Sequence, residues 1–263
     1  MITNTWTKVL PAYTAALIAA GRSPGTVRLH RHYLRHLATF APRPLTATTA
    51  QLTAALAVEH WRPETRKSAR GTYAAFYRWA HGTGLIATDP AAGLPRVTVP
   101  AGLPRPAPEH VLATALARAD PRTRLMLLLA AYGGLRCAEI AAVHREDWTA
   151  PVLFVTGKGG KTRIVPIEHP DLVAALDVGT GHLFPGQIDG HLAPATVTKA
   201  LSRVLPDPWT GHTLRHRFAT RSHEHHPDLL ALGRVLGHSK PETTSRYVLI
   251  PHAALLAVVR AAA

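Results

Sequence analysis

Hydrophobic residues recur at helical spacing along most of the chain, which predicts a mainly α-helical protein. Before residue 94 this pattern predicts amphipathic helices, and the second of them begins with a start signal in "SPGT". There Ser23 can cap the helix and Pro24 can occupy its first position. We expect these helices at residues 6–20, 24–40, 49–60 and 63–80.

Helical spacing resumes after residue 107 and is interrupted once by a pattern typical of strands. In "PVLFVTGKGGKTRIVPI", residues 151–167, two runs rich in Val, Ile, Leu and Phe flank a Gly/Lys turn, which predicts a β-hairpin. The remaining segments predict helices at 108–118, 121–133, 136–144, 168–177, 194–205, 213–225, 228–236 and 241–249.

Residues 94–108, "LPRVTVPAGLPRPAP", contain five prolines and no hydrophobic periodicity, so they are predicted to link two domains. The expected organisation is a helical domain at 1–93, this linker, and a larger mixed α and β domain at 109–263. The expected fold class is therefore mainly α with a small β-hairpin or sheet, divided into two domains.

The composition describes a folded protein without an export or membrane signal. The chain of 263 residues is 46% hydrophobic, which is enough for one large core or two modest ones. No stretch approaches a run of about 18 apolar residues, and the N-terminus lacks a basic segment followed by an apolar one, so we expect a cytoplasmic protein. Cys137 is the single cysteine, which excludes an internal disulfide and a multi-cysteine zinc site.

The charge indicates a polyanionic partner, with nucleic acid favoured over an anionic membrane because no amphipathic anchor is evident. The net charge is +14, and residues 1–98 hold twelve Lys and Arg against three acids, a net of +9. Two predicted helices separate their arginines from their apolar positions, which suggests two faces laid against DNA; a solvated face remains the alternative for any single arginine. The candidate DNA contacts are Arg28, Arg31, Arg35, Arg66, Lys67 and Arg70, with Lys161 and Arg163 on the predicted hairpin.

Four clusters later in the chain combine residue types that act on phosphate groups. The clusters are "YGGLRCAEI", "TGKGGKTRIVP", "HTLRHRFAT" and "LGHSKPETTSRY", and their candidate residues are Arg136, Lys158, His212, Arg215, His238 and Tyr247. Arginines stabilise a charged transition state with bidentate donors, and a phenol with a pKa of about 10 needs help to lose its proton. No carboxylate cluster suited to Mg²⁺ accompanies them, so the set suits attack of a tyrosine hydroxyl on a phosphodiester.

These clusters resemble those of the tyrosine recombinases, the family of phage integrases and Xer-type chromosome-dimer resolvases. "GGLRCAEI" is similar to the family's first arginine box, "GKGGKTRIVP" to its hairpin lysine, "HTLRH" to its H-x-x-R box and "LGHS…TTSRY" to its last histidine and its nucleophile. The order along the chain agrees as well. The motifs span residues 132–247, and residues 1–98 match more loosely, as a helical core-binding domain.

The resemblance implies a role for each matched residue. Tyr247 would be the nucleophile that forms a 3′-phosphotyrosyl bond, and Arg136 and Arg215 would clamp the scissile phosphate. Lys158 would protonate the departing 5′-oxygen, whereas Lys161 would contact the DNA backbone.

The two histidines complete the site that the resemblance implies. His212 would take part in proton transfer, and His238 would donate a hydrogen bond to the phosphate. No metal, ATP or other cofactor is implied, because the covalent bond to tyrosine conserves the energy of the cut phosphodiester.

The implied partner is double-stranded DNA at core attachment sites, bound by a homotetramer on synapsed DNA and by a monomer when free. An accessory DNA-bending protein is compatible with this reading, and no membrane partner is expected. The chain has no room for an arm-binding module before Trp6, so we expect simple core sites. An integrase of a phage or mobile element is favoured. The alternatives are a Xer-type resolvase, a type IB topoisomerase-like nicking and resealing enzyme, and a non-catalytic DNA-binding regulator.

The apolar tail "PHAALLAVVRAAA" suggests a further contact. In the family such a segment docks into a neighbouring protomer, which is the expectation for residues 251–260; a terminal helix packed on its own domain is the alternative. The final three alanines also look like a recognition signal for ATP-dependent proteases.

Overall fold

The computed structural model describes residues 4–100, 102–157 and 160–237. The chain divides into two compact units, residues 1–100 and 101–263. This division falls inside the proline-rich stretch, and each end of that stretch packs with a different unit. Leu94 lies in the core of the first unit, whereas Ala107 lies in the core of the second and donates a backbone hydrogen bond to Thr213.

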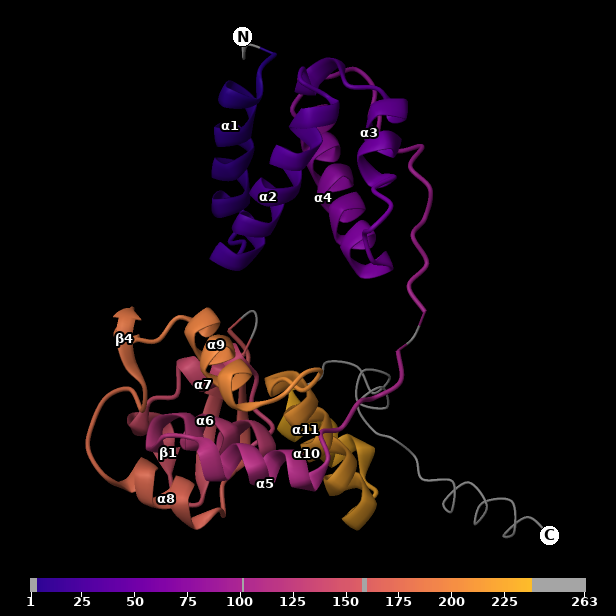
Figure 1. The fold of residues 1–263 in the computed structure, drawn as a ribbon. Helices are drawn as coiled ribbons and strands as arrows, with labels where there is room; N and C mark the ends of the chain where they lie inside the picture. Colours follow the sequence, from indigo (N-terminus) through magenta and orange to yellow (C-terminus); the bar gives the residue numbers. More distant parts are fainter. Residues whose placement is uncertain (1–3, 101, 158–159, 238–263) are drawn as a thin grey trace, which may run out of the picture. The chain divides into compact units, whose positions relative to one another are not determined.

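The first unit is a bundle of helices around an apolar core (Figure 1). Ser23 caps its second helix by accepting from the Thr26 amide, and Pro24 is the first helical residue, as the "SPGT" signal predicts. Tyr73 and Phe76 are fully buried on the fourth helix. The elements are α1 (Trp6–Ala19), α2 (Pro24–Phe40), η1 (Pro44–Thr46), α3 (Thr49–Leu56) and α4 (Pro63–Gly82).

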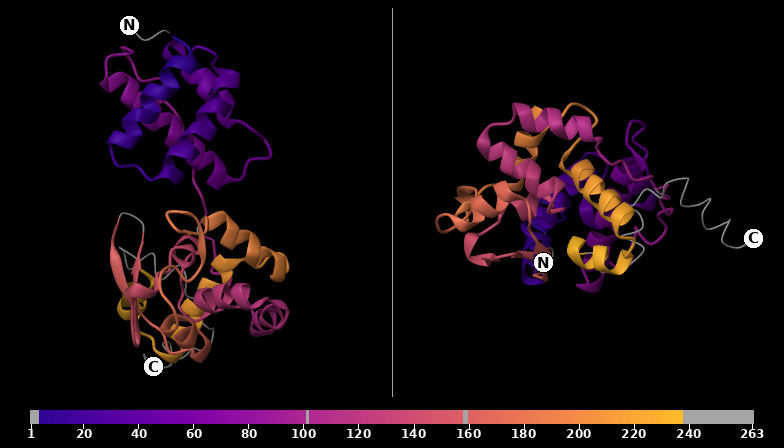
Figure 2. Two further views of the ribbon diagram at one scale, coloured as in Figure 1. Left: turned by 90° about the vertical axis from the view of Figure 1, so that its left-hand side faces the viewer. Right: turned by 90° about the horizontal axis from the view of Figure 1, so that it is seen from below.

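In its described residues, the second unit combines seven α-helices and one 3₁₀ helix with a small antiparallel sheet and a separate short strand, β4. In Figure 2 the paired strands lie at one side of this unit. The elements are α5 (Glu109–Arg118), α6 (Pro121–Ala131), α7 (Cys137–Ala141), η2 (Arg145–Asp147), β1 (Trp148–Thr149), β2 (Val152–Thr156), β3 (Thr162–Pro166), α8 (Pro170–Asp177), β4 (Pro185–Ile188), α9 (Pro194–Val204), α10 (Gly211–His225) and α11 (Leu229–Leu236).

The sheet has the order β1-β2-β3, and β2 and β3 form the predicted hairpin. Their register pairs Phe154 with Ile164 and Leu153 with Val165. Because successive side chains point to opposite faces, Leu153 and Val165 are buried while Phe154 and Ile164 are exposed. Helix α11 packs against β3, which brings the last described helix beside the hairpin.

Three helical predictions differ from the structure or lie outside it. The predicted helix 49–60 ends at Leu56, where the carbonyls of Leu56 and Val58 accept from the Arg66 side chain. The predicted helix 136–144 ends at Ala141, because the Val143 carbonyl accepts from Leu183 and residue 144 forms a β-bridge. The predicted helix 241–249 lies outside the described residues.

Candidate active site

A two-glycine turn after α6 sets the geometry of the site. Gly134 has a φ of +63°, and a Cβ there would lie 2.6 Å from the Phe218 ring; a Cβ on Gly133 would lie 2.9 Å from the Leu129 carbonyl. Only glycine fits both positions without displacing its neighbours. The turn follows α6, and α7 begins at Cys137, three residues after Gly134, with Arg136 as its N-cap residue.

Glu139 is the residue around which the site is assembled. It is 6% exposed and lies in the first turn of α7. Its Oε2 accepts from the Arg136 amide at 2.8 Å, and its Oε1 accepts from Arg136 Nη1 at 2.8 Å. The carboxylate therefore orients both the backbone and the side chain of Arg136, whose side chain keeps 39% of its surface exposed.

Arg215 approaches the same carboxylate from α10. Its side chain is fully buried, with Nη1 3.8 Å from Glu139 Oε2. Nη1 also donates to the Gly134 carbonyl, and Nη2 donates to the Leu236 carbonyl at 2.6 Å. The two arginines predicted to clamp one phosphate thus contact one carboxylate, from segments about eighty residues apart in the chain.

Arg163 completes the group from strand β3. Nη1 and Nη2 donate to the two oxygens of Glu139 at 2.9 and 2.8 Å, and Nε donates to the Val235 carbonyl at 2.6 Å. Its side chain is 9% exposed. The sequence prediction placed Arg163 among surface contacts to DNA. In the structure Arg163 pairs with Glu139, because it shares the inward face of β3 with Val165, and its contact with DNA stays a prediction.

The electrostatics of the site favour an anion. Burial raises the pKa of the Glu139 carboxyl, but hydrogen bonds from Arg163 and the Arg136 amide, with the charges of both arginines, outweigh burial and hold this pKa at about 2. Glu139 is therefore ionised at neutral pH. Its single negative charge faces the guanidinium groups of Arg136, Arg163 and Arg215, so these four side chains together carry a positive charge.

His212 lies next to this group. Helix α10 begins at Gly211, so His212 and Arg215 share a face at i, i+3. Packing around the ring lowers the pKa of the His212 imidazole, and the charges of Arg215 and Arg136 lower it further, although part of the residue is exposed. The ring also contacts His216, with centroids 4.6 Å apart. A neutral imidazole beside two arginines is suited to accept a proton at neutral pH.

The other three predicted catalytic residues, Lys158, His238 and Tyr247, lie outside the described residues. The described residue before Lys158 is close to the site: a Cβ on Gly157 would lie 3.4 Å from Glu139 Oε1. The described residue before His238 is close as well, since a Cβ on Gly237 would lie 2.8 Å from Arg163 Cδ.

The predicted DNA contacts of the first unit divide into two groups. Arg66 donates to the Leu56 and Val58 carbonyls, and Arg70 donates to the Leu94 and Pro95 carbonyls at 2.9 and 2.6 Å. Both guanidiniums join segments of the unit, and their contacts with DNA stay a prediction. The exposed candidates are Arg28, Arg31 and Arg35 on α2, Lys67 on α4 and, in the second unit, Lys161.

Sequence reasoning missed Glu139 and the exposed Arg78 of α4. Arg78 lies eleven residues after Lys67, three helical turns along the same face, and this spacing could have identified it. Glu139 follows Arg136 at i+3, a spacing typical of a helical ion pair. That spacing indicates the pair but not its burial.

No group of three or more His, Cys, Asp and Glu residues able to hold a metal ion occurs in the described part of the chain. Within the same residues, no helix is both long and apolar enough to cross a membrane. These findings concern residues 4–100, 102–157 and 160–237 alone.

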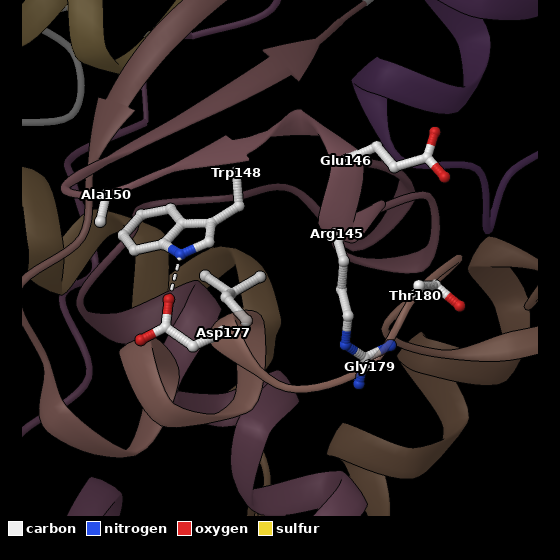
Figure 3. Close-up of a pocket in the computed structure, with 8 residues that line it drawn as sticks. Arg145, Glu146, Trp148, Ala150, Asp177, Gly179 and Thr180 are labelled. Carbon is white, nitrogen blue, oxygen red and sulfur yellow. Dashed lines mark hydrogen bonds between the residues drawn. The ribbon is translucent and has the colours of Figure 1, made fainter.

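A separate cavity of about 330 Å³ opens between η2, β1 and the end of α8 (Figure 3). Trp148 Nε1 donates to Asp177 Oδ1 at 2.7 Å across it. Arg145 donates to the carbonyls of Ala175 and His182 at 3.2 and 3.0 Å, which holds its guanidinium against the wall. None of the described residues that line this cavity belongs to the predicted site.

Comparison with known proteins identifies relatives of the chain. Residues 109–252 match the model of the Phage integrase family. A tyrosine recombinase XerC from Methylobacterium nodulans is 35% identical over 214 residues, which cover 69% of this chain and 64% of that protein. A XerC from Xanthomonas campestris pv. campestris (strain B100) is 33% identical over 222 residues, which cover 76% of this chain and 69% of that protein. The match therefore spans less than two thirds of the first relative's length.

Solved structures share the fold. A lambda integrase dimer bound to a COC′ core site superposes with a TM-score of 0.74 at 19% identity, over 92% of this chain and 77% of that one. The integrase from mycobacterium phage Brujita has a TM-score of 0.50 at 26% identity, over 94% of this chain and 96% of that one. The fold of this chain is that of these integrases.

Proposed function

We propose that this chain, which belongs to the phage integrase family, is a site-specific DNA recombinase that cleaves and rejoins strands through a phosphotyrosyl intermediate. The observation that carries the proposal is the convergence of Arg136 and Arg215 on Glu139, with His212 beside them. Two guanidiniums held at one point by a single buried carboxylate form a cationic site for a phosphate without a bound metal.

In the proposed reaction, the Tyr247 hydroxyl attacks the scissile phosphorus and loses its proton as the new P–O bond forms. Neutral His212 takes part in this proton transfer. The bond to the 5′-oxygen breaks, and Lys158 gives that oxygen a proton. Arg136 and Arg215 stabilise the charge on the non-bridging oxygens, and His238 donates a hydrogen bond to the same phosphate. Attack by a 5′-hydroxyl of another strand reverses these steps and releases Tyr247.

Arg215 places a condition on this reaction. Its side chain has no exposed surface, whereas that of Arg136 is 39% exposed. A phosphate can therefore meet Arg136 directly, but it reaches Arg215 only when the groups that cover this guanidinium move. We infer that DNA binding uncovers Arg215, so that the two-arginine clamp is completed only on the substrate.

The proposed substrate is duplex DNA, and the proposed active assembly is a tetramer on two synapsed sites. The net charge of +14 and the exposed arginines of α2 support DNA binding. Structural neighbours with the same fold include a lambda integrase tetramer bound to a Holliday junction, which supports the proposed assembly. We place the chain in the bacterial cytoplasm, with an integrase of a phage or mobile element as the preferred role.

A Xer-type resolvase is the second candidate, favoured by the XerC names of the curated relatives. The two roles differ in where the DNA site lies. A resolvase acts on a site in the host chromosome, whereas an integrase acts on one site in a mobile element and another in its host. Mapping the selected DNA site on the source genome separates them.

The test uses duplex DNA selected from a random-sequence pool by binding to the wild-type chain, then nicked so that the cleaved strand end diffuses away. Wild-type protein should accumulate a covalent complex at an unchanged rate in EDTA. Tyr247→Phe should bind the same duplex with unchanged affinity and form no complex. A trapped complex with Tyr247→Phe, or none with wild type on any selected duplex, contradicts the proposal.

A further inference from the structure

Arg163 makes three side-chain hydrogen bonds in the described site, although its place in a hairpin suggests a surface role. Its three guanidinium nitrogens each donate a hydrogen bond, two to Glu139 and one to the Val235 carbonyl. These bonds use three of its five N–H donors, and only 9% of its side-chain surface is exposed. Lys161, two residues earlier on the same hairpin, is exposed.

The contacts of Arg163 join three separate segments. The two hydrogen bonds to Glu139 connect β3 to the start of α7, where the same carboxylate orients Arg136. The bond to the Val235 carbonyl ties β3 to the last turn of α11, whose neighbouring Leu236 carbonyl accepts from Arg215. Arg163 therefore links the segment that carries Arg136 to the end of α11, where the Leu236 carbonyl accepts from Arg215.

Two glycines pack closely against this side chain. A Cβ on Gly237, which has a φ of +67°, would lie 2.8 Å from Arg163 Cδ, and a Cβ on Gly157 would lie 3.7 Å from Arg163 Nη1. In the sequence, Gly157 precedes Lys158 and Gly237 precedes His238. Arg163 thus lies close to the two glycines that come immediately before residues expected to act on the phosphate.

We propose that Arg163 is a positioning residue for strand cleavage. Its two hydrogen bonds to Glu139 and its bond to the Val235 carbonyl hold the hairpin and the end of α11 beside Arg136 and Arg215. This inference rests on the proposed recombinase function. It assigns Arg163 no contact with DNA, and it assigns binding from this hairpin to Lys161.

The chemistry of the contacts requires arginine. A lysine ammonium is a single point of charge and cannot donate to both Glu139 oxygens and to Val235 from fixed directions. Loss of Arg163 also leaves Glu139 with only Arg136 and Arg215 as cationic partners among the described residues. The carboxylate then competes more strongly with the phosphate for these two guanidiniums.

The experiment compares Arg163→Met, Arg163→Lys and Lys161→Met with the wild-type chain on the selected, nicked duplex. Methionine keeps the apolar stem of Arg163 and removes its donors. For each protein, the dissociation constant is measured over a salt series, and the rate of covalent-complex formation is measured at saturating DNA. Amide exchange is followed without DNA at residues 155–157 and 235–237.

Arg163→Met and Arg163→Lys should both form the complex on the order of 100-fold more slowly, as expected when reacting groups are misplaced by about 1 Å. Their affinity and salt dependence should match wild type, and the amides at both glycines should exchange faster. Lys161→Met should bind the duplex more weakly than the wild-type chain. In a plot of the logarithm of its association constant against the logarithm of the salt concentration, the slope should be shallower than that of wild type by about 0.9. This is the value for one lost phosphate contact.

Three results overturn the inference. One is a reduced salt slope in Arg163→Met with an unchanged saturated rate, which makes Arg163 a DNA contact. The second is a wild-type rate in Arg163→Lys, which shows that charge alone suffices. The third is unchanged amide exchange in both Arg163 variants, a readout that needs no cleavage. If Arg163→Met does not fold, Arg163→Lys tests the inference alone, through its rate of covalent-complex formation and its amide exchange. Failure of the wild-type chain to trap DNA contradicts the proposed function, while the exchange measurement still decides the role of Arg163.

Discussion

Glu139 carries one negative charge among three guanidinium groups, and this explains both its low pKa and its importance for folding. A carboxyl whose pKa is about 2 in the folded state and about 4.5 when unfolded stabilises the fold at any pH above the unfolded value. That contribution is lost as the pH falls from the unfolded pKa toward the folded one.

The first prediction concerns the stability of Glu139→Gln. At pH 7 this change should lower the free energy of unfolding by about 3 kcal/mol, because it leaves the nearly buried Arg163 guanidinium without the charge of its carboxylate partner. Urea unfolding between pH 7 and pH 3 should show the difference from wild type shrinking below about pH 4.5. Glu146→Gln, at a side chain 78% exposed, should change little. An equal deficit at every pH argues against an ionised Glu139.

The second prediction concerns His212 in cleavage. Burial and the charges of Arg215 and Arg136 lower its pKa from 6.5, so the imidazole stays neutral as the pH falls through that value. The rate of covalent-complex formation at saturating DNA should therefore hold from pH 8 to pH 6.5 and decline only below it. His212→Gln should lose this acidic decline and react more slowly throughout. A decline centred above pH 6.5 in the wild type contradicts the neutral assignment.

At this scale the sequence could predict types of residue but not their surroundings. The i, i+3 spacing of His212 and Arg215 on α10 follows from the helical pattern, and the structure has it. Glu139 and Arg163 reveal their pairing only in three dimensions, because 24 residues separate them and a strand must pair with its neighbour before they meet. A charged residue in a short strand looks like a surface residue unless the buried face of the strand is known.

Helix α4 shows how one element separates two kinds of arginine. Arg66 and Arg70 donate to carbonyls within the first unit, whereas Lys67 and Arg78 are exposed. The pattern of basic residues along a helix does not distinguish these groups. The carbonyl partners of Arg66 come from the end of α3, which the sequence predicted as continuing helix.

The third prediction follows from this division. Lys67→Ala and Arg78→Ala should each make the slope of log association constant against log salt concentration shallower by about 0.9. The thermal stability of both variants should be unchanged. Arg66→Met should instead lower stability by roughly 1 to 3 kcal/mol, because two interior carbonyls lose their charged donor, and should leave the slope unchanged. Binding titrations at several salt concentrations, together with urea unfolding, separate the two classes. A lower slope in Arg66→Met with intact stability reverses the assignment.

Element ends were harder to predict than elements. Ser23 and Pro24 define the start of α2 through local chemistry alone, and the structure begins the helix there. The end of α7 depends on a bridge between residues 144 and 182, which no local signal reveals. The hairpin was predictable because its two runs and its turn are contiguous, whereas β1 and β4 are short and were missed.

At the scale of the whole molecule, the chain consists of two units with separate cores. The division after Pro100 lies in a stretch where residues 95–100 and 102–107 form neither helix nor strand. Composition located this stretch, because prolines prevent helix formation. The sequence could not show that Leu94 and Ala107 belong to the cores, since each is a single apolar residue among prolines.

The fourth prediction is that trypsin, within the described residues, cuts first after Arg96, which is exposed and is followed by Val97, whereas Pro106 protects the bond after Arg105. The fragment containing α1–α4 should remain helical and melt cooperatively, because its core is complete without the second unit. Mass spectrometry of a digestion time course, with circular dichroism of the purified fragment, tests this. Early cleavage inside α2 or α4 contradicts two separately folded units.

The most direct test of the proposed chemistry is to identify the residue that becomes linked to DNA. The covalent complex formed on the selected duplex is digested with nuclease and trypsin, and the nucleotide-bearing peptide is sequenced by mass spectrometry. Because trypsin cuts after Arg246 and Arg260, the peptide should run from Tyr247 to Arg260 and carry its nucleotide on the Tyr247 oxygen. A nucleotide on any other side chain, or strand cleavage with no protein-linked nucleotide, contradicts the account.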